Sequence, residues 1–379
     1  MKEGEGLRAV LAVTGDRTSR FPFSSVIPVV APSMPAESTS MTEFASEERH
    51  AMSGPDRVSL VVPVRDEERT LSRLVESIQA QTRPPDEVLL VDGGSSDRTV
   101  ELALALGVRD SRFRCIDIGP ATPGRGRNLG VRAARFDWIA FTDAGIILEP
   151  NWLEELVQRV EKDPALDVVY GNVEPVRDTF FTRCAALAYV PIPSWLSPNL
   201  RWRGPFIASS LMRRSVWEAA GGFPDLRAAE DLIFMENVER AGARIAVAPE
   251  AMVHWQLRPD LLSTYRKFVL YSKHNVWAGR QYDWHHGIAR TYLLLLPFLG
   301  LAAFHHPAWV LVPVLGALAR VARSIWRRAD PPRWRTLINP AVFGMVFVIM
   351  TTIDLATFVG WAQAKRERPP QPAPSGGNP

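Results

Sequence analysis

From Val58 onward, short continuous apolar runs alternate with segments in which apolar residues recur at helical spacing. The run 58–64 is VSLVVPV, and it is followed by Leu71, Leu74, Val75 and Ile78 at positions i, i+3, i+4 and i+7. A continuous apolar run of this length indicates a buried strand, whereas the second spacing places four side chains on one face of a helix. The pattern predicts strand, turn and helix.

The same unit recurs along the first half of the chain. Strands are expected at 87–92, 112–118 and 137–143, and helices at 99–106 and 125–134. This alternation predicts an α/β fold with a mostly parallel central sheet. In such sheets, ligands bind in the crevice beyond the carboxyl ends of the strands.

Acidic residues stand at three of these carboxyl ends: Asp66 and Glu67, Asp92, and Asp143. Because the ends of parallel strands meet at one edge of a sheet, we expect these carboxylates to converge on one site. Asp92 has a structural alternative as a turn residue, since Gly93 follows it directly. Asp143 ends an apolar strand, where a charge is poorly tolerated unless a partner meets it.

The ends of the chain differ from its middle. Residues 1–56 are rich in Ser, Thr, Pro, Glu and Ala without a sustained period or a secretory signal pattern, and we expect a disordered leader there and a disordered tail at 366–379. By contrast, 292–319 contains no Asp, Glu, Lys or Arg, and 337–361 contains one acid, Asp354. Apolar stretches of this length can span a bilayer. We therefore expect the α/β domain at 57–290 and transmembrane helices within 291–365.

The basic segment 320–335 decides between two topologies. It contains six arginines and one Asp, so the positive-inside rule favours a cytoplasmic location. A hairpin of two short segments within 292–319, turning at His305, His306 and Pro307, would keep it there. The last helix, 337–361, would then place the basic residues that follow it on the outer side of the membrane, which conflicts with the positive-inside rule.

Two further segments bear on ligand binding and on the membrane. Residues 189–206 combine prolines and aromatics without a helical period, which is typical of a variable binding loop. Residues 261–279 predict a basic, aromatic helix that suits the membrane interface; an ordinary packed helix of the catalytic domain is the alternative. The aromatic and basic residues concerned are Tyr265, Arg266, Lys267, Phe268, Tyr271 and Lys273.

Composition narrows the classes of function. The 379 residues are 46% hydrophobic and 22% charged with a net charge of +3, which excludes a wholly disordered chain and argues against a nucleic-acid binder. The only cysteines, Cys115 and Cys184, supply neither a four-thiolate zinc site nor a disulfide framework. A reduced, cytoplasm-facing catalytic part is therefore expected.

Five motifs between Val58 and Trp255 together resemble the family 2 glycosyltransferases with the GT-A fold. They are VVPVRDEERTL, LLVDGGSSDRT, GRGRNLGVRAA, FTDAG and AAEDLIFMENVERAG, in this order. The resemblance implies transfer of a sugar from a nucleotide-activated donor to an acceptor hydroxyl, with inversion at the anomeric carbon. It also implies that Pro63 and Glu67 hold the nucleotide base and that Asp92 contacts the nucleoside.

The resemblance also bears on a metal ion. Asp143 matches the first acid of the family's Asp-x-Asp motif, but the third position, which usually ligates the divalent ion, is Gly145. Mg²⁺ or Mn²⁺ can still rest on one carboxylate together with substrate phosphates and water. His254 could add a nitrogen ligand, as a downstream histidine does in related enzymes, or it could serve packing beside Trp255.

Transfer of a sugar from such a donor requires a positive group and a general base. A departing diphosphate gains negative charge, which Arg125 or Arg127 at a helix start could meet; a solvated helix start is the alternative. The proton of the attacking hydroxyl needs an acceptor, and Asp231 matches the family's catalytic base. Its neighbour Glu230 would orient a substrate group or cap the helix.

The sequence thus predicts an inverting glycosyltransferase in the cell inner membrane, multi-pass, with its catalytic domain in the cytoplasm. The expected partners are a nucleotide-sugar donor, a lipid-linked or polysaccharide acceptor and membrane lipid. The alternative is a catalytically silent nucleotide-sugar-binding scaffold, suggested by Gly145 and opposed by the retained acids Asp143, Glu230 and Asp231. A processive synthase is disfavoured because the Gln-x-x-Arg-Trp motif is absent.

Overall fold

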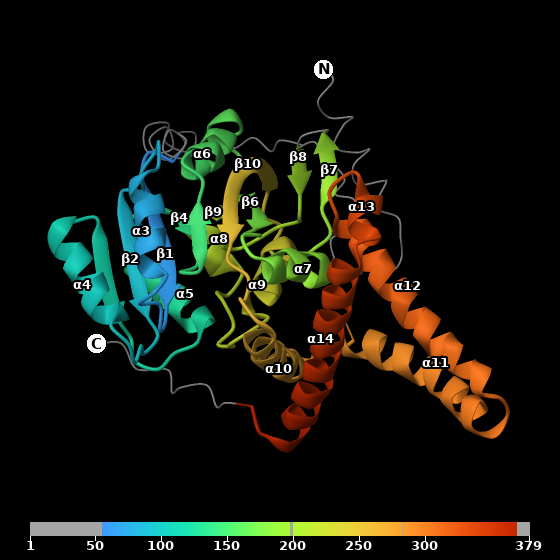
Figure 1. The fold of residues 1–379 in the computed structure, drawn as a ribbon. Coiled ribbons are helices and arrows are strands. Elements are labelled where there is room, and N and C mark those ends of the chain that lie inside the picture. The colour runs from blue at the N-terminus through green and yellow to red at the C-terminus, as the bar shows by residue number, and fades with distance from the viewer. Residues whose placement is uncertain (1–54, 198–199, 283, 370–379) are drawn as a thin grey trace, which may run out of the picture.

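The computed structural model describes residues 55–197, 200–282 and 284–369. The predicted leader 1–56 lies outside these ranges except for residues 55 and 56, and of the predicted tail 366–379 the part 370–379 lies outside. Arg366, where the tail was expected to begin, is the last residue of a helix. Within them, the expected α/β fold is confirmed: a central sheet carries helices on both faces, and long helices follow at the C-terminal end (Figure 1).

The central sheet has eight strands in the order β3-β2-β1-β4-β9-β6-β10-β5. The pairings of β1 with β2 and β4, of β2 with β3, and of β6 with β10 are parallel, whereas β9 and β5 pair in the antiparallel sense. The strands are β1 Val58–Val64, β2 Glu87–Asp92, β3 Phe113–Asp117, β4 Trp138–Phe141, β5 Ile146–Leu148, β6 Val168–Pro175, β9 Ser210–Arg213 and β10 Ile245–Trp255.

The sheet is buried on both faces, which explains the continuous apolar runs. Successive residues of β1 point to opposite sides: Leu60 and Val62 join one core cluster, and Val61 joins the other. Helices of the first cluster are α3 Leu71–Gln79, α4 Thr99–Arg109 and α6 Trp152–Lys162; those of the second are α5 Pro123–Ala133, α8 Arg214–Ala219 and α9 Glu230–Arg240.

The predicted binding loop at 189–206 follows α7 Phe180–Tyr189 and forms a small hairpin of β7 Ser194–Ser197 and β8 Leu200–Trp202. The buried guanidinium of Arg203, just after β8, lies 2.9 Å from the Glu174 carboxylate on β6. This ion pair anchors the hairpin to the sheet. Its role in acceptor binding stays a prediction.

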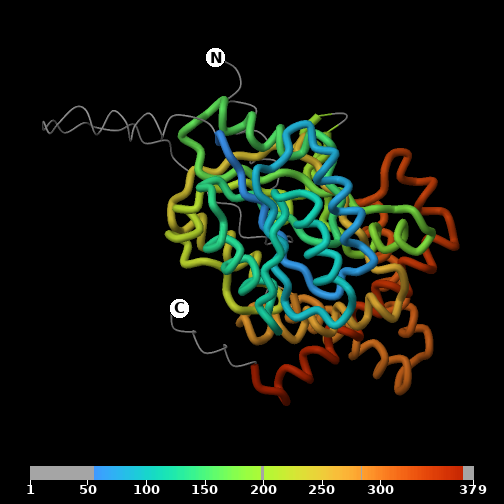
Figure 2. The backbone as a smooth tube through the Cα atoms, turned by 90° about the vertical axis from the view of Figure 1, so that its left-hand side faces the viewer, coloured from blue at the N-terminus to red at the C-terminus, as the bar shows by residue number. Residues whose placement is uncertain are grey.

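The C-terminal part consists of α10 Leu261–Trp277, α11 His285–Phe304, the short 3₁₀ helix Pro307–Val310, α12 Leu311–Arg328, α13 Arg333–Leu337 and α14 Pro340–Arg366. Among the described residues, three helical segments are long and apolar enough to cross a membrane: 285–304, 307–328 and 340–366. The chain turns at His305, His306 and Pro307, where we expected it to turn, but both arms extend beyond 292–319 and neither is short. Both views place these helices at the border of the α/β domain (Figures 1 and 2).

The helices are joined to one another and to the α/β domain by polar contacts. Asp354 on α14 binds the Arg320 guanidinium of α12 and accepts a hydrogen bond from the Tyr292 hydroxyl of α11 at 2.8 Å. Asp330, in the basic segment 320–335, pairs with Arg177 of the α/β domain at 2.9 Å. The basic segment therefore contacts that domain near its C-terminal end.

Helix α10 lies between the α/β domain and α14. The rings of Phe268 and Tyr271 face each other edge-on, and Phe268 makes the same type of contact with Tyr189 and Trp284. Both rings are partly buried against neighbouring elements, as the alternative of a packed helix expects. A position of α10 at the membrane interface stays a prediction.

Candidate active site

Arg127 on α5 is the centre of the candidate site. Its side chain is buried, and its two terminal nitrogens reach different elements: Nη1 lies 2.9 Å from Glu230 Oε1 at the start of α9, and Nη2 lies 2.7 Å from Asp143 Oδ1 just after β4. The guanidinium also lies over the ring of Phe223, 5.4 Å from its centroid. One cation thus joins the end of a central strand to the start of α9.

The start of α9 holds two neighbouring acids in a strained backbone. Ala229, the residue before the helix, has φ +68°, a left-handed conformation that is unfavourable for a residue with a Cβ. Glu230 follows and binds Arg127, while Asp231 Oδ1 accepts a hydrogen bond of 2.8 Å from the Leu232 N–H. Asp66, after β1, is the other described non-glycine residue with positive φ. Backbone strain of this kind clusters at functional sites.

Burial sets the protonation of these acids. It raises the pKa of Glu230, and the charge of Asp231 raises that pKa further, while Arg127 opposes both effects. Burial likewise raises the pKa of Asp231, against the lowering influence of Arg127. Burial alone would lower the pKa of Arg127, but Asp143 and Glu230 hold it above its ordinary value. Asp231 is therefore a stronger base, once ionised, than an exposed aspartate.

Of the two predicted base-binding residues, Pro63 lies near the end of β1 and Glu67 follows this strand. Pro63 lies beside α5, where a Cβ on Gly126 would come to 3.4 Å from the Pro63 ring. The Glu67 carboxylate accepts a hydrogen bond from the Thr70 hydroxyl, and its backbone N–H donates to Thr99 Oγ1 at 2.8 Å. Burial raises the pKa of Glu67, and the charge of Asp143 adds to this shift. Glu67 and Asp143 therefore act on each other across the strand ends, as the convergence argument predicted.

Asp92 also lies at its strand end, but its oxygens are engaged. Asp92 Oδ2 accepts hydrogen bonds of 2.9 Å from the N–H groups of Gly94 and Ser95, and Oδ1 accepts from the Ser95 hydroxyl. These are the contacts of the turn residue that was weighed as the alternative. Its contact with a nucleoside stays a prediction.

A metal ion would find few ligands here. His254 Nε2, on β10, contacts the Glu149 carboxylate, and in the described ranges no group of three or more His, Cys, Asp or Glu side chains could hold a metal. Asp143 keeps one oxygen free of Arg127. The residues present therefore fit an ion that rests on one carboxylate and the substrate's phosphates, and they form no closed cage. The ligand role of His254 stays a prediction.

Sequence reasoning missed the contribution of α10 to this site. The Tyr271 ring lies near both acids: burial raises its pKa, and the charges of Asp231 and Glu230 raise it further. Lys267, one turn earlier, places its ammonium over the rings of Trp255 and Tyr271, at 5.0 and 5.2 Å from their centroids. The pattern identified a basic aromatic helix but could not show that these side chains face the strand ends.

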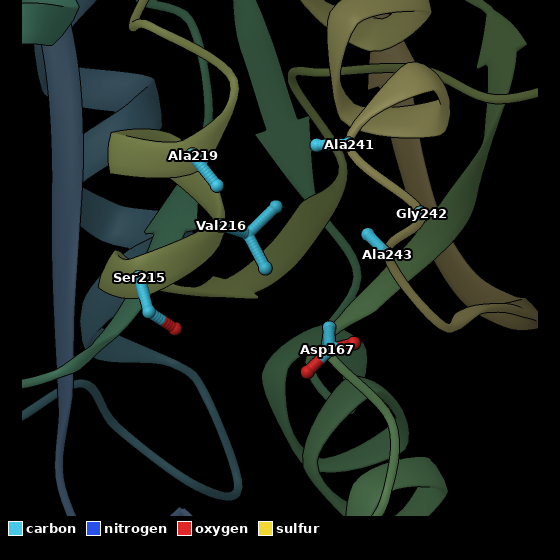
Figure 3. A pocket seen from close by; sticks show the side chains of 7 residues that line it. All are labelled: Asp167, Ser215, Val216, Ala219, Ala241, Gly242 and Ala243. Atoms are coloured by element: carbon cyan, nitrogen blue, oxygen red, sulfur yellow. The ribbon is translucent and has the colours of Figure 1, made fainter.

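Figure 3 shows a pocket elsewhere in the domain, which differs from the candidate active site in its lining residues. It lies between α8, the turn after α9 and the residue before β6, and small side chains line it together with Val216 and Asp167. Asp167 precedes β6, so the pocket lies at the opposite end of the parallel strands from Asp143. Because its one acid already accepts the Arg244 N–H at 2.9 Å, we assign no chemistry to it.

Two curated relatives each match 55% of this chain. The succinoglycan biosynthesis protein ExoO of Rhizobium meliloti is 30% identical over 221 residues, which are 55% of this chain and 63% of the relative. The putative glycosyltransferase EpsH of Bacillus subtilis is 27% identical, over 55% of this chain and 64% of the relative. The chain thus spans less than two thirds of the length of these curated relatives.

Among solved structures, this chain is similar to S. aureus TarS 1–349 in complex with UDP-GlcNAc, at 15% identity and a TM-score of 0.42, covering 82% of this chain and 92% of that one. Residues 59–208 match the family described as glycosyl transferase family 2. The resemblance inferred from the five motifs is thereby confirmed: the chain carries a glycosyl transferase family 2 domain.

Proposed function

We propose that this chain is an inverting glycosyltransferase that moves a sugar from a nucleotide-sugar donor to a hydroxyl of a lipid-linked or polysaccharide acceptor at the cytoplasmic membrane face. The observation that carries the proposal is the junction at Arg127, which brings Glu230 and Asp143 within 3 Å of one guanidinium. Asp231 follows Glu230 directly, so the proposed base lies beside the strand end where the donor would bind.

The reaction assigns a role to each acid. The acceptor hydroxyl oxygen forms a bond to the anomeric carbon while the bond from that carbon to the diphosphate breaks, and the electron pair leaves with the diphosphate. Asp231 takes the hydroxyl proton through the oxygen that does not accept the Leu232 N–H. Arg127 holds Glu230 and Asp143 in position. A divalent cation bound with the donor at Asp143 would neutralise part of the diphosphate charge.

Two observations support the membrane part of the proposal. Three apolar helices follow the catalytic domain, and the basic segment 320–335 contacts that domain through Asp330. A basic segment favours the cytoplasmic side, where nucleotide sugars are made. Among the relatives, the names of the succinoglycan protein and of the Salmonella typhimurium O-antigen chain rhamnosyltransferase RfbN support a polysaccharide acceptor.

The test uses sealed membrane vesicles that contain the full chain, a panel of nucleotide sugars, and the variant Asp231→Asn. We expect inside-out vesicles to release nucleoside diphosphate from one added donor. Because general-base catalysis contributes roughly 10²–10⁴ in rate, Asp231→Asn should lose at least about 100-fold in turnover while it still binds that donor. Glu239→Gln, an exposed position on the same helix, is the matched control and should keep its turnover.

The same assay separates the alternatives. Donor binding without turnover by the unmodified chain would favour the silent scaffold. Turnover in right-side-out vesicles alone would place the catalytic domain outside. Near-normal turnover by Asp231→Asn would remove this carboxylate from the mechanism.

A further inference from the structure

Lys267 stands out among the basic residues of α10 because it lies at the catalytic site and has no acidic partner. Its side chain is half-buried between the rings of Trp255 and Tyr271. In the described parts of the chain, no carboxylate oxygen lies within ion-pair distance of its ammonium. Lys273, on the same helix, has a similar position over the ring of Trp277, at 5.2 Å, but it pairs with Glu367 at 2.9 Å.

The charges around Lys267 come from three other segments. Burial lowers the pKa of Lys267 to about 8, Arg258 before α10 lowers it too, and the carboxylates Asp143 and Glu67 oppose this effect. Two cations therefore lie close together beside the strand ends, and the nearby acids do not pair with Lys267 directly. Holding a half-buried ammonium without a partner is unfavourable, and an anion bound there would remove the penalty.

These two cations lie near the position where the motif at Asp143 lacks its second carboxylate. Gly145 leaves Asp143 without a second carboxylate in its motif, and a Cβ added at Gly145 would meet no atom within 4 Å. A donor's diphosphate lying against Asp143 alone would be repelled unless positive charge stood beside it. The Lys267 ammonium lies over the ring of Trp255, and Trp255 pairs in the sheet with Ile146, the residue after Gly145. Lys267 acts electrostatically on Asp143 and Glu67, and Arg258 acts on Glu67.

We propose that Lys267, with Arg258 beside it, forms the binding site for the diphosphate of the donor and stabilises the negative charge that develops as the diphosphate leaves. The inference rests on the proposed function. It makes Lys267 a catalytic residue in its own right and gives the aromatic rings of Trp255 and Tyr271 the role of fixing its ammonium.

The test compares ligands that differ by one phosphate. Affinities of the purified full chain for nucleoside monophosphates and diphosphates of each common base are measured by calorimetry, once in EDTA and once in Mg²⁺. Wild type should prefer one diphosphate over its monophosphate in EDTA. In Lys267→Met we expect this preference to fall on the order of tenfold to 100-fold, as for the loss of a charge-assisted contact. Lys267→Arg should restore most of it, and Lys273→Met should keep it.

The outcomes are separable. If wild type and Lys267→Met prefer the diphosphate equally, or if the preference appears only in Mg²⁺ and persists in Lys267→Met, the inference is wrong while the proposed function stands. If the variant loses monophosphate and diphosphate affinity by the same factor, Lys267 has a structural role alone. If wild type binds no nucleotide at all, the proposed function itself fails and this inference fails with it.

Discussion

Replacing Arg127 by Met tests whether the junction of the two acids is held by charge. The variant keeps a long apolar stem against Phe223 and removes the guanidinium that binds Glu230 and Asp143. Glu230 then remains buried beside Asp231 without its cation. Breaking a buried ion pair by removing one partner is strongly destabilising, because the remaining charge is left uncompensated.

The magnitude follows from the exposure of the two pairs. The side chains of Arg127 and Glu230 are 4% and 8% exposed, so this pair falls in the range of buried pairs, whose disruption costs about 3–5 kcal/mol. Asp143 is 39% exposed, and solvent screening limits its pair to at most about 1 kcal/mol. We expect a decrease in melting temperature of roughly 6–20 °C for a domain of this size.

The pH dependence has a definite sign. The pKa values of Glu230 and Asp231 are raised in the folded protein, so their contribution to stability is present below their unfolded values and is lost as the pH rises through the folded values. Without Arg127 both folded values rise further. The melting temperature of Arg127→Met should therefore fall more steeply between about pH 5 and 8 than that of the wild type.

The assay is a thermal-shift series over this pH range on detergent-purified wild type, Arg127→Met, Glu230→Gln and the double variant. In the double variant, the uncharged amide that replaces the Glu230 carboxylate needs no cation. The double variant should therefore have a higher melting temperature than Arg127→Met, and this temperature should depend less on pH. The reasoning is refuted if Arg127→Met loses less than about 1 kcal/mol, or if the double variant is no more stable than Arg127→Met.

Two further predictions concern glycines. A Cβ on Gly360 of α14 would lie 2.6 Å from Ser272 Cβ and would also collide with the Val269 carbonyl oxygen, so Gly360→Ala should separate α14 from α10 and destabilise the protein by about 1–3 kcal/mol. Gly344→Ala on the same helix meets no atom and should change the melting temperature little; equal melting temperatures would contradict the packing described for α14. Gly145→Asp should supply a second carboxylate beside Asp143. Adding Mn²⁺ should then increase the affinity for the nucleoside diphosphate by a factor on the order of tenfold larger in this variant than in the wild type. An unchanged gain in calorimetry would show that position 145 does not reach the bound diphosphate.

The elements that the sequence predicted well are those whose pattern reflects burial on defined faces. β1 and α3 appear where the apolar run and the helical spacing placed them, because both contribute several fully buried side chains. The antiparallel strand β9, inserted between β4 and β6, was not predicted, since a short strand such as SLMR has no period of its own.

The candidate site also has a part that the sequence could predict and a part that it could not. Asp143, Glu230 and Asp231 could be proposed from motifs, whereas Arg127, expected to meet the leaving diphosphate, instead pairs with Glu230 and Asp143. The part contributed by α10 could not, because this helix is enclosed on more than one side and its fully buried residues are the polar Thr264, Ser272 and His274. A polar buried face gives no apolar stripe, so nothing in the pattern shows which way Lys267 points.

The close packing of α14 along α10 connects the last apolar helix directly to the helix that borders the candidate active site. Gly360 lets the two helices touch closely, and α10 in turn presents Tyr271 to the acids at the start of α9. A shortened form that ends before residue 285 would lose the contacts that α14 makes with α10. In the proposed membrane-anchored enzyme, a change in the tilt of α14 would therefore also displace the helix that carries Lys267 and Tyr271.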